Sequence, residues 1–240
     1  MCEVILYTPS HEGSLSSLEV DHIKDVIQLW TERYRELSKK DYVKYVFIFE
    51  NKGRETGTTL DHPHGQIYAF PFIPPVIKTE LKSSKQYWNR HRACLFCRIL
   101  RAEQRNGSRM VYENDDFACF LPFFARWPYG VHIYPKRHVQ ALTDLTEKEQ
   151  KMFAVTLKNV LTKFDNVFQM SFPYMMVFHQ KPSDGKTHNH YHFHMEFYPP
   201  YRGRGKVKHF ASVETGAGTV TFDYSPEDKA KELRESLGAS

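Results

Sequence analysis

The chain contains one pattern twice, and this duplication restricts the fold more than any other feature. Two histidine-rich strings, His62-Pro63-His64-Gly65-Gln66 and His192-Phe193-His194-Met195-Glu196, each open an apolar run that leads into prolines. Their alignment also brings residues 49–52 close to 178–181, and residues 6–11 near 132–138. Two copies about 130 residues apart are not a solenoid, so each copy should be a domain-sized α+β unit.

The first copy should run from an apolar strand at residues 4–7 through a helix to strands at 42–49 and 66–72. The helix is predicted from one apolar stripe with helical spacing, made of Ile23, Val26, Ile27, Trp30, Tyr34 and Leu37. The second copy repeats this order, with a helix that begins near Thr146 in capping-box spacing with Glu149. Its strands are expected at 117–121, 130–134, 175–178 and 193–198.

The duplication divides the chain into a first half at residues 1–77, a linker at 78–92 and a second half at 93–240. The halves should share one sheet or core. In the second copy His138 lies 44 positions after Cys94, whereas ten residues precede His11. The first half is therefore expected to be truncated at its N-terminus, or to receive the corresponding part from another polypeptide.

Composition excludes several classes of protein. No apolar run reaches the roughly 18 residues of a membrane span, and the N-terminus lacks a signal-peptide pattern, so we expect a cytoplasmic protein without a membrane partner. The net charge of +5 over 240 residues is too small to indicate nucleic-acid binding. It is compatible with phosphorylated substrates.

Cys94 and Cys97 are separated by two residues, the spacing that forms one edge of a tetrahedral zinc site. His138 and His192 are the expected remaining ligands, because they occupy the same places in the second copy as His11 and His62 in the first. The alternative is a buried pair of reduced thiols. No cysteine pair precedes His11 and His62, so that half-site should be incomplete.

His64 is the candidate nucleophile. It lies two residues from His62, on the same face of an extended segment, and a near-neutral imidazole can attack phosphorus if its other ring nitrogen is fixed by a hydrogen bond. Gly65 should let a ligand approach the backbone. Gln66 points to the same face, where its amide can donate to a phosphoryl oxygen. The alternative reading of His64 is a hydrogen-bonded core histidine.

The loop upstream of His62 is suited to an anion. It runs from Glu50-Asn51-Lys52-Gly53 to Gly57-Thr58-Thr59 and offers backbone amides, hydroxyls and one side-chain amide.

Together these segments resemble the galactose-1-phosphate uridylyltransferase family of the histidine-triad superfamily. The resemblance rests on FENKG at 49–53, Gly57, HPHGQ at 62–66, Trp127-Pro128, YPKRH at 134–138, Asp165-Asn166, SFPY at 171–174 and FYPP at 197–200. It covers nearly the whole chain. It implies an α+β fold of two tandem histidine-triad-like halves, with a mainly antiparallel sheet and flanking helices.

The resemblance also implies a reaction. His64 would attack the α-phosphorus of UDP-glucose, release glucose 1-phosphate, and hold the uridylyl group until galactose 1-phosphate takes it as UDP-galactose. Gln66 would stabilise that intermediate. Matching positions imply nucleotide contacts from Glu50, Asn51, Gly57, Thr58 and Thr59, and hexose-phosphate contacts across a homodimer interface from Lys208, His209, Val213 and Glu214.

The chain departs from the family's pattern at a second metal site. Some members bind iron or zinc there with a glutamate and three histidines; Glu80, His179 and His194 match, but Glu196 replaces the last histidine. The cysteine pair Cys94 and Cys97 also resembles that of family members with a second zinc site, including the related ADP-glucose phosphorylases. Two alternatives to uridylyl transfer stay open. One is an adenylyl-transferring phosphorylase of the same superfamily. The other is an impaired, zinc-stabilised nucleotide-binding protein, because the missing front of the first copy should remove part of the base pocket.

Overall fold

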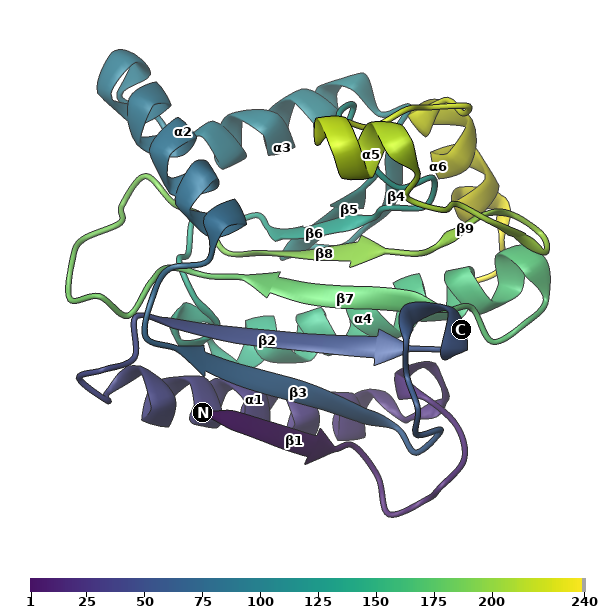
Figure 1. Cartoon of the computed structure of the whole chain (residues 1–240), viewed down its shortest axis with the longest axis horizontal. Helices are drawn as coiled ribbons and strands as arrows, with labels where there is room; N and C mark the ends of the chain where they lie inside the picture. The colour runs from purple at the N-terminus through teal and green to yellow at the C-terminus, as the bar shows by residue number, and fades with distance from the viewer. Residues whose placement is uncertain (239–240) are drawn as a thin grey trace.

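One continuous antiparallel sheet of eight strands organises the chain in the computed structural model, which describes residues 1–238 (Figure 1). The strand order is β1-β3-β2-β7-β8-β6-β5-β4. The strands are β1 (Cys2–Leu6), β2 (Tyr45–Lys52), β3 (His64–Phe70), β4 (Met110–Glu113), β5 (Phe117–Phe120), β6 (His132–Pro135), β7 (Tyr174–His179) and β8 (His194–Tyr198). A two-stranded sheet of β9 (Tyr201–Gly203) and β10 (Lys206–Val207) follows. The expected α+β fold is confirmed.

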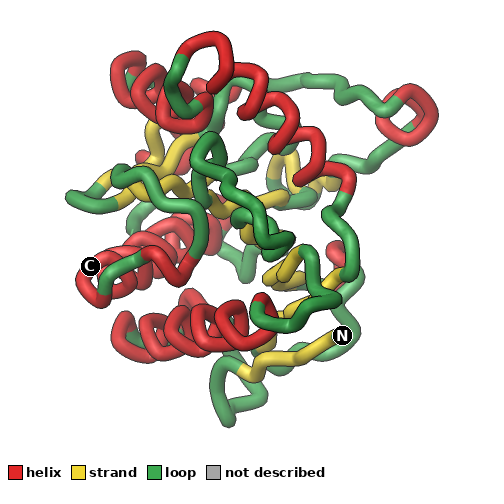
Figure 2. Tube along the Cα trace, turned by 90° about the vertical axis from the view of Figure 1, so that its left-hand side faces the viewer, coloured by secondary structure: helices red, strands yellow, loops and turns green. Residues whose placement is uncertain are grey.

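The helices lie on both faces of this sheet (Figures 1 and 2). They are α1 (Val20–Ser38), α2 (Pro75–His91), α3 (Leu95–Asn106), α4 (Glu147–Phe168), α5 (Ser212–Ala217) and α6 (Pro226–Glu235). The larger core lies between the sheet and α1, α4 and α6. A smaller core lies on the opposite face, where α2 and α3 pack on strands of the second copy and on Tyr45 of β2. None of the helices in residues 1–238 is long and apolar enough to cross a membrane.

The local signals in the sequence explain where the long helices form. The predicted stripe of α1, from Ile23 to Leu37, is buried. At the start of α4 the Thr146 hydroxyl accepts a hydrogen bond from the Glu149 amide, while the Glu149 carboxylate accepts one from the Thr146 amide at 2.8 Å. The expected linker is the helix α2, which ends at Arg92 in the left-handed region (φ 51°).

The two copies meet at the centre of the sheet, where β2 pairs with β7. On either side β3 corresponds to β8 and β1 to β6. In the second copy α3, β4 and β5 precede β6, and no counterpart of these three elements precedes β1 within residues 1–238.

The register corrects one detail of the alignment. Gln66 pairs with Phe49, and its counterpart Glu196 pairs with Val177. The positional counterpart of His179 is therefore Asn51, one residue further along than the sequence comparison of Glu50 with His179 indicated.

Candidate functional site

His64 is the first residue of β3 and is held in one orientation. Its Nδ1 lies 2.7 Å from the carbonyl oxygen of His62. A carbonyl oxygen can only accept, so Nδ1 carries the proton and the lone pair of a neutral ring lies on Nε2. This is the tautomer that a nucleophile toward phosphorus requires.

His64 lines a cavity of about 310 Å³ at the end of β2 and β3. The cavity includes Asn51 and Thr58 of the predicted anion loop, together with Lys52, His11 and His62. The loop is folded on itself, because the Thr58 hydroxyl donates to the Asn51 carbonyl at 2.6 Å and Gly57 is left-handed (φ 85°). Gly57 and Thr59 do not line this cavity.

Gln66 lies on the same side of β3 as His64, because the residues alternate along a strand. Its side-chain oxygen accepts a hydrogen bond of 3.3 Å from the Tyr68 hydroxyl. That bond leaves the amide nitrogen of Gln66 available as a donor.

The role expected for Gly65 needs correction. A Cβ at this position would lie 2.1 Å from the hydroxyl oxygen of Tyr7 and 3.3 Å from the carbonyl oxygen of Phe49. The space beside Gly65 is thus taken by Tyr7 and not by a ligand. Sequence reasoning missed Tyr7, because nothing in the pattern of a short apolar strand marks it as the neighbour of the nucleophile.

Glu50 is among the residues that line the cavity, but its side chain is buried. It is only 4% exposed, and its Oε1 accepts a hydrogen bond of 3.0 Å from the Tyr174 hydroxyl. Burial raises the pKa of Glu50 to about 7, and burial together with the nearby Glu50 carboxyl raises the pKa of Tyr7. The carboxyl group therefore supports the strand beneath the nucleophile, and we interpret it as a positioning group more than a substrate contact.

His11 and His62 face each other at the rim of the cavity. Their Nδ1 atoms are 3.1 Å apart, and His62 Nε2 donates to the carbonyl oxygen of Thr8 at 2.8 Å. The arrangement resembles the pair His138 and His192 in the second copy, whose Nδ1 atoms are 3.2 Å apart.

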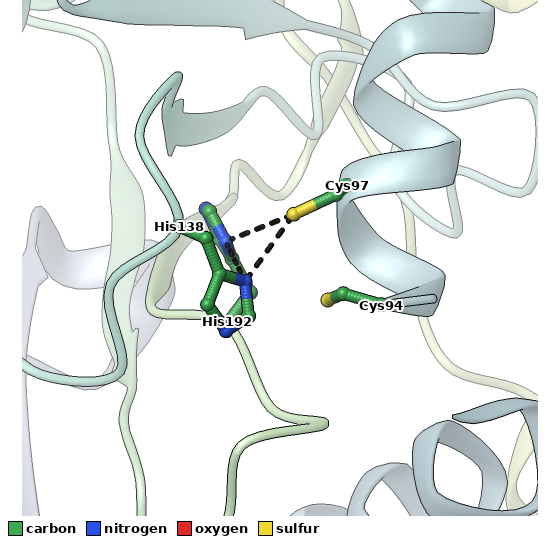
Figure 3. Close-up of side chains that lie close together, drawn as sticks. All are labelled: Cys94, Cys97, His138 and His192. Atoms are coloured by element: carbon green, nitrogen blue, oxygen red, sulfur yellow. Dashed lines mark hydrogen bonds between the residues drawn. The ribbon is translucent and has the colours of Figure 1, made fainter. Parts of the chain in front are cut away.

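Cys94, Cys97, His138 and His192 converge as the sequence predicted (Figure 3). The Sγ atom of Cys97 lies 3.3 Å from His138 Nδ1 and 3.5 Å from His192 Nδ1, and the two Nδ1 atoms are 3.2 Å apart. These three distances match one face of a ligand tetrahedron of the size that zinc occupies. Cys94 precedes α3 and Cys97 lies in its first turn, whereas the histidines come from the ends of β6 and β8.

The protonation states suit a metal ligand set. His192 Nε2 donates to the Pro135 carbonyl at 3.0 Å, which leaves Nδ1 unprotonated in the neutral ring. Burial lowers the pKa of His192 to about 3, so the ring stays neutral at ordinary pH. Hydrogen bonding from Cys97 lowers the pKa of the Cys94 thiol to about 5. Two sulfur and two nitrogen donors of this kind fit zinc.

A second buried group joins Glu80, His179, His194 and Glu196. His179 Nδ1 lies 2.9 Å from a Glu80 oxygen, and His194 Nε2 lies 3.2 Å from Glu196 Oε1. Glu196 thus lies in the group in spite of its departure from the family's pattern.

The predicted hexose-phosphate segment lies together but apart from the His64 cavity. Lys208 pairs with Glu214 at 3.5 Å, and Glu214 also accepts from the Ala211 amide at the start of α5. Val213 is exposed. Lys208, His209, Val213 and Glu214 are all absent from the lining of the cavity.

Comparison with known proteins decides the family. The N-terminal domain of galactose-1-phosphate uridyl transferase matches residues 1–74, and its C-terminal domain matches residues 80–235. The chain belongs to the galactose-1-phosphate uridylyltransferase family.

The family relatives are similar over nearly all of the chain. The galactose-1-phosphate uridylyltransferase of Thermotoga maritima is 45% identical over 237 residues, which are 98% of this chain and 74% of that protein. The one of Haemophilus influenzae is 36% identical and covers 96% of this chain, which spans 66% of its length.

Solved structures agree with this assignment. A uridylyltransferase structure superimposes with a TM-score of 0.92 at 40% identity, over 97% of this chain and 74% of the other. An ADP-glucose phosphorylase from Arabidopsis thaliana superimposes with a TM-score of 0.87 at 24% identity, over 98% of this chain and 72% of the other, and shares the fold.

Proposed function

We propose that the chain is a nucleotidyltransferase that moves a uridylyl group between UDP-glucose and galactose 1-phosphate through a covalent intermediate on His64. The observation that carries the proposal is the fixed tautomer of His64 at the mouth of a cavity bounded by the anion loop. Membership of the family supports the choice of substrates.

The first half-reaction follows from that tautomer. Nε2 of His64 forms a bond to the α-phosphorus of UDP-glucose, and the bond from that phosphorus to the bridging oxygen breaks. Glucose 1-phosphate leaves with the electron pair. The proton stays on Nδ1 and keeps its hydrogen bond to the His62 carbonyl. This hydrogen bond stabilises the positive charge that develops on the ring.

The second half-reaction reverses these changes. A phosphate oxygen of galactose 1-phosphate attacks the same phosphorus, the phosphorus–nitrogen bond breaks, and UDP-galactose leaves. The electron pair returns to Nε2, so the ring is neutral again. The amide of Gln66, on the same face of β3, would donate to the phosphoryl oxygens in both steps.

Intact-mass measurement tests the reaction class directly. Incubation with UDP-glucose should add the mass of one uridylyl group, and His64→Ala should abolish the addition. His91→Ala is a matched control, because His91 is an exposed histidine at the end of α2 and should load like the wild type. Loading from ADP-glucose instead of UDP-glucose would support the adenylyl alternative, and loading from neither would refute both.

We also propose that zinc at Cys94, Cys97, His138 and His192 is structural, because four protein ligands leave no open position for a substrate. Two reduced thiols as ligands suit the cytoplasm, where we place the enzyme. Metal analysis of protein purified without chelators should find zinc that is lost in Cys94→Ser.

A homodimer completes the proposal. In the first copy the face of the sheet that carries His64 holds a row of aromatic rings in mutual contact, and Phe47 and Phe70 of this row pack in part against the smaller core formed with α2 and α3. The row consists of Phe47, Phe49, Tyr68, Phe70 and Phe72. Because Lys208 and His209 lie apart from the His64 cavity, a second copy would have to bring its own segment to it.

Complementation tests the shared site. Co-expression of His64→Ala with Lys208→Ala should restore about one quarter of the wild-type activity, since half of randomly paired dimers are mixed and each contains one intact site. No recovery from the two inactive variants would show that each chain uses its own Lys208, and the shared site would be wrong.

A further inference from the structure

The net positive charge of the chain is concentrated in one segment. Residues 82–106, from the middle of α2 to the end of α3, contain seven lysines and arginines and one acidic residue. This excess is larger than the net charge of +5 of all 240 residues, so the rest of the chain is close to neutral. A local excess of this size indicates an anionic partner.

These cations are not neutralised within the protein. In residues 1–238, every ion pair of a lysine or an arginine involves a cation other than these seven. The acidic residue of the segment, Glu103, is buried and pairs with Arg109 at 2.7 Å. Arg98, Arg101 and Arg105 follow one another at i, i+3 and i, i+4 on α3, where like charges repel. This surface is suited to take its countercharge from a ligand.

A cavity of about 760 Å³ opens beside two of these arginines. It lies between the C-terminal end of α2 and the first turns of α3, and Arg98 and Arg101 line it. Among the described residues, none that lines this cavity also lines the cavity of His64. Binding sites for small molecules commonly have volumes of about 300–1,000 Å³. The cavity is therefore large enough for a nucleotide and is separate from the proposed reaction centre.

Aromatic rings form the wall of the cavity that α2 provides. Tyr87 and Trp88 are half-buried and line the cavity, and the ring of His91 lies 4.3 Å from the ring of Tyr87 at an angle of 34°. Trp88 also packs in part against the smaller core, so the fold restrains its ring. Aromatic side chains of this kind stack on nucleobases, and they do so without selecting one base.

Part of the remaining wall consists of expected zinc ligands. Cys94, Cys97 and His138 line the cavity, and Figure 3 shows Cys97 pointing from α3 toward the two histidines. A zinc ion held by two thiolates and two neutral imidazoles has no net charge. Zinc at this group would therefore not supply a charge that balances the arginines.

We propose that the cavity binds a nucleotide with at least two phosphates, whose base stacks on the aromatic rings of α2 and whose phosphates bind Arg98 and Arg101. Guanidinium groups bind phosphate oxygens through paired, charge-assisted hydrogen bonds, and two arginines about one helical turn apart suit two phosphates. A sugar phosphate would leave the aromatic wall unused, and an apolar ligand would leave the charges unpaired. The site lies outside the transfer reaction and does not depend on it.

The fluorescence of Trp88 tests the site in the full-length protein. ADP is the probe, and a base stacked on Trp88 should quench its emission in a saturable way. Trp88→Phe keeps an aromatic ring but should remove this quenching, which separates the signal from that of the chain's other tryptophans. If ADP caused no saturable quenching, or if Trp88→Phe left the quenching unchanged, the proposal would be wrong.

Charge variants distinguish the cavity from the general charge of α3. Arg98→Gln combined with Arg101→Gln should weaken ADP binding about 10-fold or more, because charge-assisted contacts to phosphate are removed. Arg105→Gln is the matched control, since it removes the same charge from the same helix at a position that does not line the cavity. Equal weakening in the control and in the double variant would show that ADP binds the helix surface and not the cavity.

Ligands that lack one part of ADP test the chemical class. Pyrophosphate has no base and adenosine has no phosphate, so each should bind about 10-fold or more weakly than ADP in competition. Pyrophosphate that competed as well as ADP would indicate a site for anions in general. A single-stranded oligonucleotide that bound much more tightly than ADP would indicate a nucleic-acid surface. Either result would overturn the proposal.

The neighbouring cysteine site supplies an independent readout. A nucleotide in the cavity covers Cys97 and His138, so ADP should slow the loss of zinc to the neutral chelator phenanthroline in protein that contains zinc. The double arginine variant should lose zinc at the same rate with and without ADP. If ADP quenched Trp88 but left the rate of zinc loss in the wild type unchanged, the ligand would not lie over Cys97 and this placement would be wrong.

Discussion

The contact between Gly65 and Tyr7 makes Gly65→Ala a sharp test of how the nucleophile is positioned. The new methyl group would lie 2.1 Å from the Tyr7 hydroxyl oxygen and 2.9 Å from the Tyr7 ring carbon that bears it. Tyr7 cannot retreat freely, because its amide donates to the Pro63 carbonyl at 3.0 Å and its ring packs on Trp30. The strand cannot retreat either, because β3 is paired on both sides with β1 and β2.

The magnitude follows from these restraints. Overpacking of this kind costs about 1–3 kcal/mol of unfolding free energy. Replacing a glycine within a strand regains about 0.5–1 kcal/mol through the unfolded state, since the backbone of Gly65 is not left-handed. We expect a net loss of about 1–2 kcal/mol. A displacement of His64 by about 1 Å would also slow uridylyl loading about 100-fold.

Urea unfolding and single-turnover loading from UDP-glucose measure the two effects. Tyr7→Phe removes the hydroxyl but keeps the 2.9 Å ring contact, so it should restore part of the stability and of the loading rate to Gly65→Ala. Tyr7→Phe alone is the control. If Gly65→Ala unfolded at the wild-type urea concentration and loaded at the wild-type rate, Tyr7 would not constrain the nucleophile strand.

Three further predictions use the same assays. His64→Ala should lose all transfer and keep its stability, and more than a few per cent of residual activity would exclude His64 as the nucleophile. Cys94→Ser should lower zinc content and melting temperature together, and a variant that lost zinc without becoming less stable would contradict a structural ion. The pKa of Glu50 is raised to about 7 by burial, so its contribution to stability is complete below the pKa of an unfolded glutamate and falls as the pH rises toward 7 and beyond. Between pH 5 and pH 8 the free energy of unfolding of the wild type should therefore fall by about 2 kcal/mol more than that of Glu50→Gln. Equal losses would show that the pKa of Glu50 is not raised in the folded protein.

The sequence predicted those features that repeat or that depend on near neighbours. Spacing within short segments predicted the buried stripe of α1 and the capping box at Thr146. The cysteine spacing and the duplication together predicted that Cys94, Cys97, His138 and His192 converge. The resemblance to the family added the reaction and the individual substrate contacts expected around His64.

The features that the sequence did not predict depend on partners far apart in the chain. Tyr7 lies beside Gly65, Tyr174 donates to Glu50, and His132 faces Glu196. Each is a single residue within or directly after an apolar strand, and only the register of the sheet brings it to its partner. A register error of one residue also explains why the alignment paired Glu50 with His179, since a pattern match without strand pairing does not fix the phase of a strand.

The pairing of β2 with β7 at the centre of the sheet has a consequence for the order of folding. Lys52 of β2 pairs with Tyr174 of β7. During synthesis about 120 further residues must therefore be added before β7 can pair with the open edge of β2. At ribosomal speeds of about 5–20 residues per second, this interval lasts roughly 6–25 s. Meanwhile β1, β3 and β2 present two open edges and a row of aromatic rings, which are the features that chaperones bind and that drive aggregation. Chaperones should therefore matter most for this protein during the interval in which only the first copy has been synthesised.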